Sequence, residues 1–289
     1  MKLFYFILLL LPFSVKCQNN FSQDWLSCIV ELQKPDVNGV LQNHGTGFTL
    51  YNYRNNGNDG LYIVTCAHVL KNPFIYVRIP AVDTASKILG KKNLQYNVDG
   101  RLWFYDGFSF ATKIDLFLNK TFIKNDSLDI AIIKFDVSVP SIDTIQLVKL
   151  KGIAQSRIAK KERVEVATGL YFVGFPLGIG SSQGYYQSKK YSDSKINPLV
   201  RGGIMAWKSD ETSEFLVDGI SYAGNSGSPV FSQINPWGDV PPSLVGMVLG
   251  HLSDITVEQV DINQGLVRCI WIDEILKLRD EFEKLGIKK

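Results

Sequence analysis

The chain has few of the residues that mark metal-binding or nucleic-acid-binding proteins. Its 289 residues include only four cysteines and three histidines, with no Cys/His cluster of metal-site spacing. The 31 Lys and Arg residues nearly balance the 28 Asp and Glu residues, so no strong field is available to steer nucleic acid. No glycine-rich phosphate loop is present. We therefore expect no metal, no cofactor and no nucleic-acid partner.

The apolar run near the N-terminus is too short to cross a bilayer as a helix. It covers residues 3–13, eleven residues in all, between Lys2 and the polar residues 18–20. This pattern predicts a signal peptide at residues 1–17 and a mature chain at 18–289. Its removal lowers the formal charge from +3 to +1. We expect a secreted or periplasmic product without stable membrane insertion. Lipid anchoring at Cys17 is the alternative, to which Lys16 is a poor fit.

Three cysteines remain in the predicted mature chain, namely Cys28, Cys66 and Cys269. An odd number in an exported protein leaves at least one free thiol or an intermolecular bridge. Cys66 lies in an apolar run, where a packed thiol is expected. A Cys28–Cys269 bridge between the first and last strands is one open pairing.

Short apolar runs separated by Gly, Asn, Asp and Pro predict an all-β sandwich or barrel. The runs are residues 28–32, 47–51, 61–70, 74–79, 130–137, 170–175, 215–217 and 244–249. The aromatic residues between positions 71 and 125 favour further half-buried strands. One helix is predicted at residues 273–285, where apolar residues recur at near-helical spacing.

Three short motifs in one order predict nucleophilic catalysis. They are TCAH at residues 65–68, DIAII at 129–133 and GNSGSP at 224–229. A serine hydroxyl needs a base to take its proton, and His68 ends a buried apolar run that would hold it rigidly. Asp129 precedes another buried strand, where a carboxylate needs a partner such as the His68 imidazole. The motifs thus predict Ser226 as nucleophile, His68 as base and Asp129 as the group that orients the base.

Other residues fit these roles less well. His44 stands in a turn-like stretch, and His251 reads equally as a solvated loop residue. Asp126 is expected to cap a turn. Gly224 and Gly227 flank the serine, so the N–H groups of Gly224 and Ser226 can form an oxyanion hole.

The order His, Asp, Ser and the three motifs resemble the chymotrypsin/trypsin-like serine protease superfamily. GTGF at 45–48, GLYFVGFPLG at 169–178 and GNSGSPVF at 224–231 are similar to the bacterial Deg/HtrA-type and glutamyl-endopeptidase-like branch. The resemblance implies two six-stranded antiparallel β-barrels with the active site between them. Their expected limits are about 25–137 and about 157–272, with a linker at about 138–156 and a C-terminal α-helix at about 273–287.

The resemblance also implies a substrate pocket. Its floor would be Ile220, six residues before Ser226, and one wall would be residues 248–251, which are Val248, Leu249, Gly250 and His251. An apolar floor favours an apolar substrate side chain. Glutamyl endopeptidases hold a substrate carboxylate with a histidine that matches Val248 here, so acid specificity is the second choice.

The sequence therefore predicts a secreted serine endopeptidase acting on proteins or peptides, cleaving after an apolar residue. Asn225 stands where animal digestive proteases carry an aspartate, so activation by N-terminal insertion is not expected. An α/β-hydrolase is disfavoured because Ser228 replaces the last glycine of its motif and no helical pattern follows. A catalytically silent or ligand-gated protease-like binding protein is the main alternative.

Overall fold

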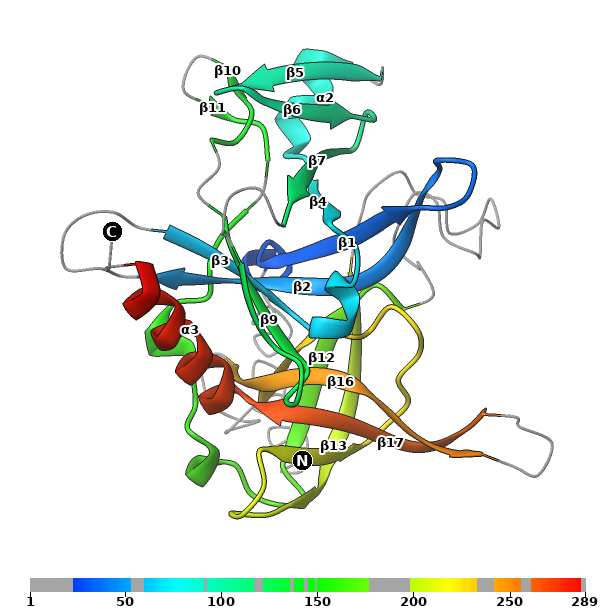
Figure 1. Ribbon diagram of the computed structural model, residues 1–289, viewed down its shortest axis with the longest axis vertical. Helices are drawn as coiled ribbons and strands as arrows, with labels where there is room; N and C mark the ends of the chain where they lie inside the picture. The colour runs from blue at the N-terminus through cyan, green and yellow to red at the C-terminus, as the bar shows by residue number, and fades with distance from the viewer. Residues whose placement is uncertain are drawn as a thin grey trace, which may run out of the picture.

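The computed structural model shows a mostly β-stranded chain in two units with a helix at its end (Figure 1). It describes residues 23–52, 60–90, 93–116, 122–135, 138–142, 145–148, 150–176, 198–232, 242–255 and 261–286. The predicted signal peptide, Cys17 included, lies outside these residues, as do Leu177 and Gly178 of the GLYFVGFPLG segment. Among the described residues, no helix combines the length and apolar character needed to cross a membrane.

The N-terminal unit is one antiparallel sheet in the order β5-β6-β7-β4-β1-β2-β3-β9-β8. Its strands are β1 (Ile29–Pro35), β2 (Leu41–Asn52), β3 (Gly60–Thr65), β4 (Phe74–Pro80), β5 (Leu94–Val98), β6 (Arg101–Tyr105), β7 (Ser109–Asp115), β8 (Phe122–Asn125) and β9 (Ile130–Lys134). β3 and β9 pair near the β8 edge of the sheet, and most of their residues are buried. Burial on both faces explains why these strands read as continuous apolar runs.

The C-terminal unit is a closed six-stranded barrel in the order β12-β13-β14-β17-β16-β15. Its strands are β12 (Gly169–Gly174), β13 (Leu199–Lys208), β14 (Glu214–Asp218), β15 (Pro229–Ser232), β16 (Ser243–Ile255) and β17 (Asp261–Trp271). On β14, Phe215 and Val217 point inward while their neighbours are more exposed, as the period of two requires. Phe215 stacks on Trp271 with ring centroids 4.3 Å apart inside the barrel.

The segment between the units also contributes to the core. It forms the two-residue strands β10 (Ser141–Ile142) and β11 (Ile145–Gln146), followed by the 3₁₀ turns η2 (Gln155–Arg157) and η3 (Lys161–Arg163). Ile153 is buried and pairs with Leu50 of β2. The larger apolar cluster continues from the sheet to Phe231 and Leu249 of the barrel, so the two units share a core.

Helix α3 (Ile272–Gly286) covers both units at one side, contacting β8, β9, β16 and β17 (Figure 1). It buries Ile275 and Leu278 and exposes Lys277, Asp280, Glu281 and Lys284. The short helix α1 (Gln23–Leu26) places the Trp25 ring edge-on to Phe231 of β15, with centroids 4.7 Å apart.

The all-β class, the closed six-stranded second barrel and the C-terminal helix are confirmed. The first unit has nine described strands instead of six, because the β5–β6 hairpin extends the edge at β7 and β8 extends the other edge at β9. The expected strand at residues 61–70 ends at Thr65, and the rest of that apolar run forms the 3₁₀ turn η1 (Ala67–Leu70). The short helices α1 and α2 (Asp83–Leu89) were not expected.

Candidate active site

His68 and Asp129 contact each other at the ends of two adjacent strands. His68 lies in η1 directly after β3, and Asp129 directly precedes β9. The His68 Nδ1 atom lies 2.7 Å from Asp129 Oδ2, and the His68 backbone N–H donates to Asp129 Oδ1 at 2.9 Å. Both carboxylate oxygens are therefore used to hold one residue. With its hydrogen on Nδ1, the imidazole keeps Nε2 as a proton acceptor.

The backbone of Asp129 is held in a strained form by the turn that leads to it. Its φ of +53° is in the left-handed region, which residues other than glycine rarely adopt. Asn125 Oδ1 accepts the N–H groups of Ser127 and Leu128, each at 3.1 Å, and so closes the turn. Asp126, expected to cap this turn, instead pairs with Lys124 at the surface. An amide at position 125 can cap the turn without adding charge near Asp129.

Ser226 lies in the loop between β14 and β15, in two consecutive turns. The Asn225 N–H donates to the Tyr222 carbonyl at 3.0 Å, and the Ser228 N–H donates to the Asn225 carbonyl at 2.9 Å. Gly224 and Gly227 have φ values of +94° and +88°. Such values are readily accessible only to glycine, which explains both glycines of the motif.

The two units hold the serine segment from opposite sides. On the β2 side, the Thr46 N–H donates to the Ser226 carbonyl at 2.9 Å, and the Thr46 hydroxyl donates to the Gly224 carbonyl at 2.7 Å. On the β16 side, the Gly227 N–H donates to the Val248 carbonyl at 2.9 Å. The serine is thereby fixed where the sheet and the barrel meet.

The Ser226 side chain is not bonded to the histidine in this conformation. Its hydroxyl donates to the Leu249 carbonyl at 3.2 Å, and no hydrogen bond joins it to His68 in the described part of the chain. Catalytic hydrogen bonds are often long or poorly aligned before a substrate binds, and they tighten in the complex. Attack on a substrate requires the hydroxyl to turn from Leu249 toward His68.

The N–H groups of Gly224 and Ser226, predicted as oxyanion donors, have no acceptor within the described residues. Both N–H groups belong to the turn segment that Thr46 holds by donating to the Gly224 and Ser226 carbonyls. Unpaired backbone donors beside a serine hydroxyl can stabilise negative charge on a bound carbonyl oxygen.

The residues predicted to form the substrate pocket differ in how far they are exposed. Ile220 is 47% exposed, and the space over Gly250 is open. His251 is half-buried on β16 opposite Val267. The side chains of Val248 and Leu249 are buried in the core, so these two residues support the serine segment through their carbonyls.

Among the described residues, Cys28, Cys66 and Cys269 are buried and no disulfide joins them, so the open Cys28–Cys269 pairing is wrong for this structure. The reason is geometric, because the two thiols lie in separate apolar clusters. Cys66 has a potential ligand atom within 4.8 Å of those of His68 and Asp129. However, its thiol donates to the Val248 carbonyl at 3.3 Å, and burial raises the pKa of this thiol well above its ordinary value. A protonated thiol is a poor metal ligand, so we interpret this group as a hydrogen-bonded support.

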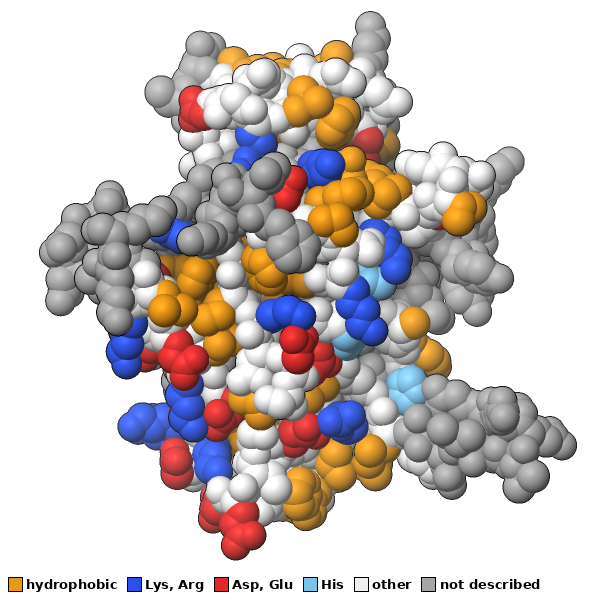
Figure 2. All heavy atoms as spheres, viewed as in Figure 1, with side chains coloured by type: hydrophobic (Ala, Val, Ile, Leu, Met, Phe, Trp, Pro, Cys, Tyr) orange, Lys and Arg blue, Asp and Glu red, His pale blue; other side chains and the backbone are white. Residues whose placement is uncertain are grey.

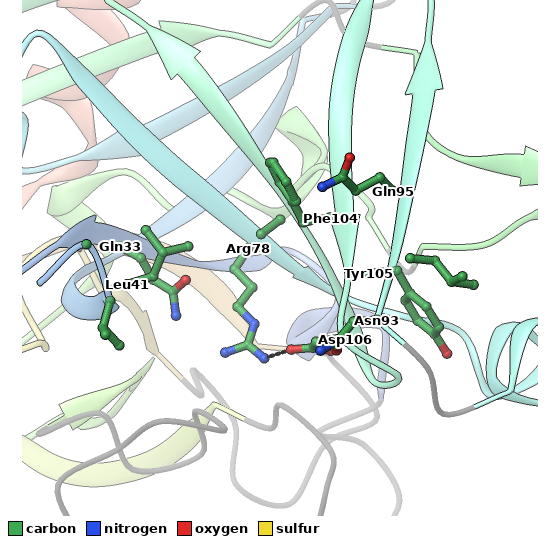
Figure 3. A pocket seen from close by; sticks show the side chains of 12 residues that line it. Gln33, Leu41, Arg78, Asn93, Gln95, Phe104, Tyr105 and Asp106 are labelled. Atoms are coloured by element: carbon green, nitrogen blue, oxygen red, sulfur yellow. Dashed lines mark hydrogen bonds and ion pairs between the residues drawn. The ribbon is translucent and has the colours of Figure 1, made fainter.

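A cavity of about 430 Å³ lies elsewhere, among β1, β2, β4 and the β5–β6 hairpin (Figure 3). Arg78 points into it and bonds Asp106, as the dashed line shows. Arg78 also lies 3.7 Å from the buried Glu31, so its charge is already balanced. None of the predicted site residues lines this cavity, and we do not assign the chemistry to it.

Two residues near the serine were not predicted from the sequence to have a role. Thr46 stands within the GTGF segment, but only the fold shows that its hydroxyl reaches the serine loop. His44 was predicted to lie in a turn, but it belongs to β2 and lies close to His68. The glycine-rich segment itself was the only available signal for either residue.

The comparisons with known proteins agree with this geometry. A family model described as a trypsin-like peptidase domain matches residues 45–235. The matched range includes His68, Asp129 and Ser226. A search of curated proteins found no match.

Proposed function

The chain belongs to the trypsin-like peptidase domain family, since the match covers more than half of its length, and we propose that it is a serine endopeptidase. The observation that carries the proposal is the use of both Asp129 carboxylate oxygens to hold His68. A fixed imidazole with a free Nε2, and a serine hydroxyl that can turn toward it, are suited to general-base catalysis.

The proposed reaction is acyl transfer to Ser226. His68 takes the hydroxyl proton as Ser226 Oγ bonds to the substrate carbonyl carbon, and the N–H groups of Gly224 and Ser226 bind the oxyanion. His68 then gives the proton to the leaving amine as the peptide bond breaks. Water, deprotonated by His68, next attacks the acyl ester, and Ser226 recovers its proton. Asp129 stabilises the transient imidazolium without taking its proton.

We further propose cleavage after an apolar residue in protein or peptide substrates. The exposed Ile220 and the open space over Gly250 support an apolar pocket. The GTGF and GNSGSPVF segments support the Deg/HtrA-type or glutamyl-endopeptidase-like branch. The apolar residues 3–13 support secretion.

Digestion of an unfolded protein tests the proposal. The mature protein and its Ser226→Ala variant are incubated with a reduced, alkylated protein, and new peptide ends are identified by mass spectrometry. We expect new ends after apolar residues with the wild type only. Identical ends from both proteins would contradict the catalytic role of Ser226, and a preference for Lys or Arg would contradict the apolar pocket.

A ligand-gated protein is the second candidate. It is favoured by the hydrogen bond from Ser226 to the Leu249 carbonyl, which occupies the nucleophile. In this case a bound ligand would release the hydroxyl toward His68. Peptide hydrolysis that begins only after a second peptide is added would distinguish this candidate from a constitutive enzyme.

A further inference from the structure

A β-bulge places His44 beside the serine segment. In the pairing of β1 with β2, Leu32 lies opposite Gly45 and Gln33 lies opposite Asn43, so His44 is the extra residue. A bulge redirects the side chain at the extra position. Two residues later, the Thr46 N–H bonds the Ser226 carbonyl. His44 therefore lies at the edge of the candidate active site.

The same face of β1 and β2 is directed toward the site. A Cβ atom on Gly45 would meet the Val69 side chain at 2.8 Å and the Ser226 carbonyl at 3.3 Å. Gly45 is opposite Leu32, and Lys34 follows Leu32 by two residues on an unbulged strand. Side chains two residues apart on a strand share a face, so Lys34 lies on the face that borders the site.

A second lysine borders the site from the turn that carries His68. Lys71 ends η1 and is exposed, two residues after the Val69 that contacts Gly45. Within the part of the chain that the structure describes, neither Lys34 nor Lys71 forms an ion pair or a side-chain hydrogen bond. Two unpaired ammonium groups thus flank one edge of the site.

His44 itself stays uncharged between these groups. Burial first, and then the charges of Lys34, His68 and Lys71, lower the pKa of His44 to about 4. At neutral pH its ring can still donate one hydrogen bond to an anion. Figure 2 shows His side chains on one face of the molecule, close to Lys and Arg side chains.

The position of this group relative to the scissile bond follows from the proposed mechanism. His68 must give its proton to the leaving amine, so the leaving part of the substrate lies toward η1. β16 holds Ser226 from the other side through Leu249 and Val248. The peptide that follows the scissile bond therefore runs toward β2 and η1, where both lysines lie.

We propose that Lys34, Lys71 and His44 form a carboxylate-binding site on the leaving-group side of Ser226. The site selects substrates with an acidic side chain, or a free C-terminal carboxylate, shortly after the scissile bond. This inference rests on the proposed serine endopeptidase function. It adds a requirement on the leaving peptide to the apolar requirement on the acyl side.

Binding to the Ser226→Ala variant tests the site without turnover. Four fluorescent peptides share one apolar acyl half and have Glu or Gln as the second residue after the scissile bond, with either a free C-terminal acid or an amide three residues after it. Binding is followed by fluorescence anisotropy. We expect one of the two carboxylates to strengthen binding about fivefold, an amount that two partly exposed ion pairs can supply. The Glu/Gln and acid/amide comparisons identify which carboxylate is bound.

Variants of the lysines provide the controls. Lys34→Gln and Lys71→Gln, each combined with Ser226→Ala, should each remove at least half of the preference. Lys87→Gln, an exposed lysine on α2 away from the site, should leave it unchanged. The preference should also shrink as salt rises from about 0.05 M to about 0.3 M. Equal affinities for all four peptides, or no binding of any peptide, would overturn the site.

Labelling of the wild type with a fluorophosphonate separates this inference from the proposed function. A labelled protein without carboxylate preference retains the enzyme assignment and loses the carboxylate site. A carboxylate preference in a protein that is not labelled supports the site and contradicts the catalytic function.

Discussion

Thr46 is the residue that connects the sheet to the serine loop. Its hydroxyl donates to the Gly224 carbonyl at 2.7 Å and accepts the Phe175 N–H at 3.0 Å. Its backbone N–H bonds the Ser226 carbonyl, and its carbonyl accepts the Thr65 hydroxyl at 2.8 Å. All of these bonds are made by one fully buried side chain and its peptide groups. We interpret Thr46 as a positioning residue for the oxyanion donors.

Replacement Thr46→Val should reduce kcat about tenfold or more with little change in KM, because the Gly224 carbonyl loses its donor and the oxyanion donors are no longer fixed. Thr46→Ser should restore most of the activity. Thr49→Val is the matched control, since the buried Thr49 hydroxyl on the same strand bonds the Cys28 and Lys151 carbonyls away from the site. Both valine variants should lose about 1–3 kcal/mol of stability. Equal kcat losses in both would contradict the positioning role.

Gly227 leaves no room for a side chain. A Cβ atom there would lie 2.0 Å from the Thr46 carbonyl oxygen and 2.5 Å from Thr65 Oγ1, and the φ of +88° is unfavourable for other residues. Gly227→Ala should therefore destabilise the fold by about 3 kcal/mol or more, measured by urea unfolding. Gly250→Ala, near the same serine but facing open space, should change stability by less than about 1 kcal/mol. Similar stability of the two variants would be inconsistent with this packing.

His44 should make stability depend on pH. Its pKa falls from 6.5 to about 4 on folding, so between these values the unfolded chain binds more protons and stability is lost as pH falls. Because the ring is partly exposed, we expect a loss of about 1 kcal/mol between pH 7 and about pH 4.5. Urea unfolding measures the free energies of unfolding of the wild type and of His44→Gln at both pH values. The expected loss is the change, between the two pH values, in the difference between these free energies. Parallel behaviour of the two proteins would contradict the shift.

At the scale of elements, Arg78 joins three parts of the N-terminal sheet. From β4 it lies 3.7 Å from Glu31 of β1, bonds Asp106 after β6, and donates to Ser109 of β7 at 2.6 Å. Glu31 has no exposed surface, and its Oε2 atom has no hydrogen-bond partner among the residues that the structure describes. The carboxylate therefore depends on Arg78 for charge compensation.

Arg78→Met should destabilise the protein by about 3–5 kcal/mol, because it leaves the Glu31 charge buried and unpaired. The double variant Arg78→Met, Glu31→Gln should recover at least about half of this loss, since no buried charge remains. Urea unfolding of the two variants measures both values. A double variant as unstable as the single one would show that Arg78 acts through packing and its bonds to Asp106 and Ser109 instead.

The elements differ in how far the sequence could predict them. β9 and β14 follow directly from their apolar patterns, as does α3 from its helical spacing. The apolar run at residues 61–70 predicts one strand throughout. Ala67, Val69 and Leu70 continue its apolar pattern because they are buried in η1, as residues of β3 are. Apolar content alone does not separate these two forms. The β5–β6 hairpin is short and half-exposed, so its alternation gave only a general expectation of strands.

The site residues also differ in how far the sequence could predict them. The local motifs predict His68, Asp129 and Ser226 as site residues, and the structure places His68 Nδ1 2.7 Å from Asp129 Oδ2. The Thr46 hydroxyl bonds a carbonyl 178 residues away in the chain, and no local pattern encodes such a contact. The His44 bulge depends on the pairing of β1 with β2, which is also set by the fold.

At the scale of the whole molecule, the account depends on two units meeting at one serine. The N-terminal unit supplies His68, Asp129 and Thr46, and the barrel supplies Ser226 and its support from β16. The apolar cluster shared by both units fixes their relative position. A reactive serine should therefore exist only in the folded protein.

Fluorophosphonate labelling of the purified mature protein tests this claim most directly. We predict one label per molecule, read by intact mass, for the wild type and for Ser156→Ala, an exposed serine in η2. Ser226→Ala, His68→Ala and the urea-unfolded wild type should carry no label. A folded wild type that stays unlabelled, or a label that persists in Ser226→Ala, would contradict the assignment of Ser226 as an activated nucleophile.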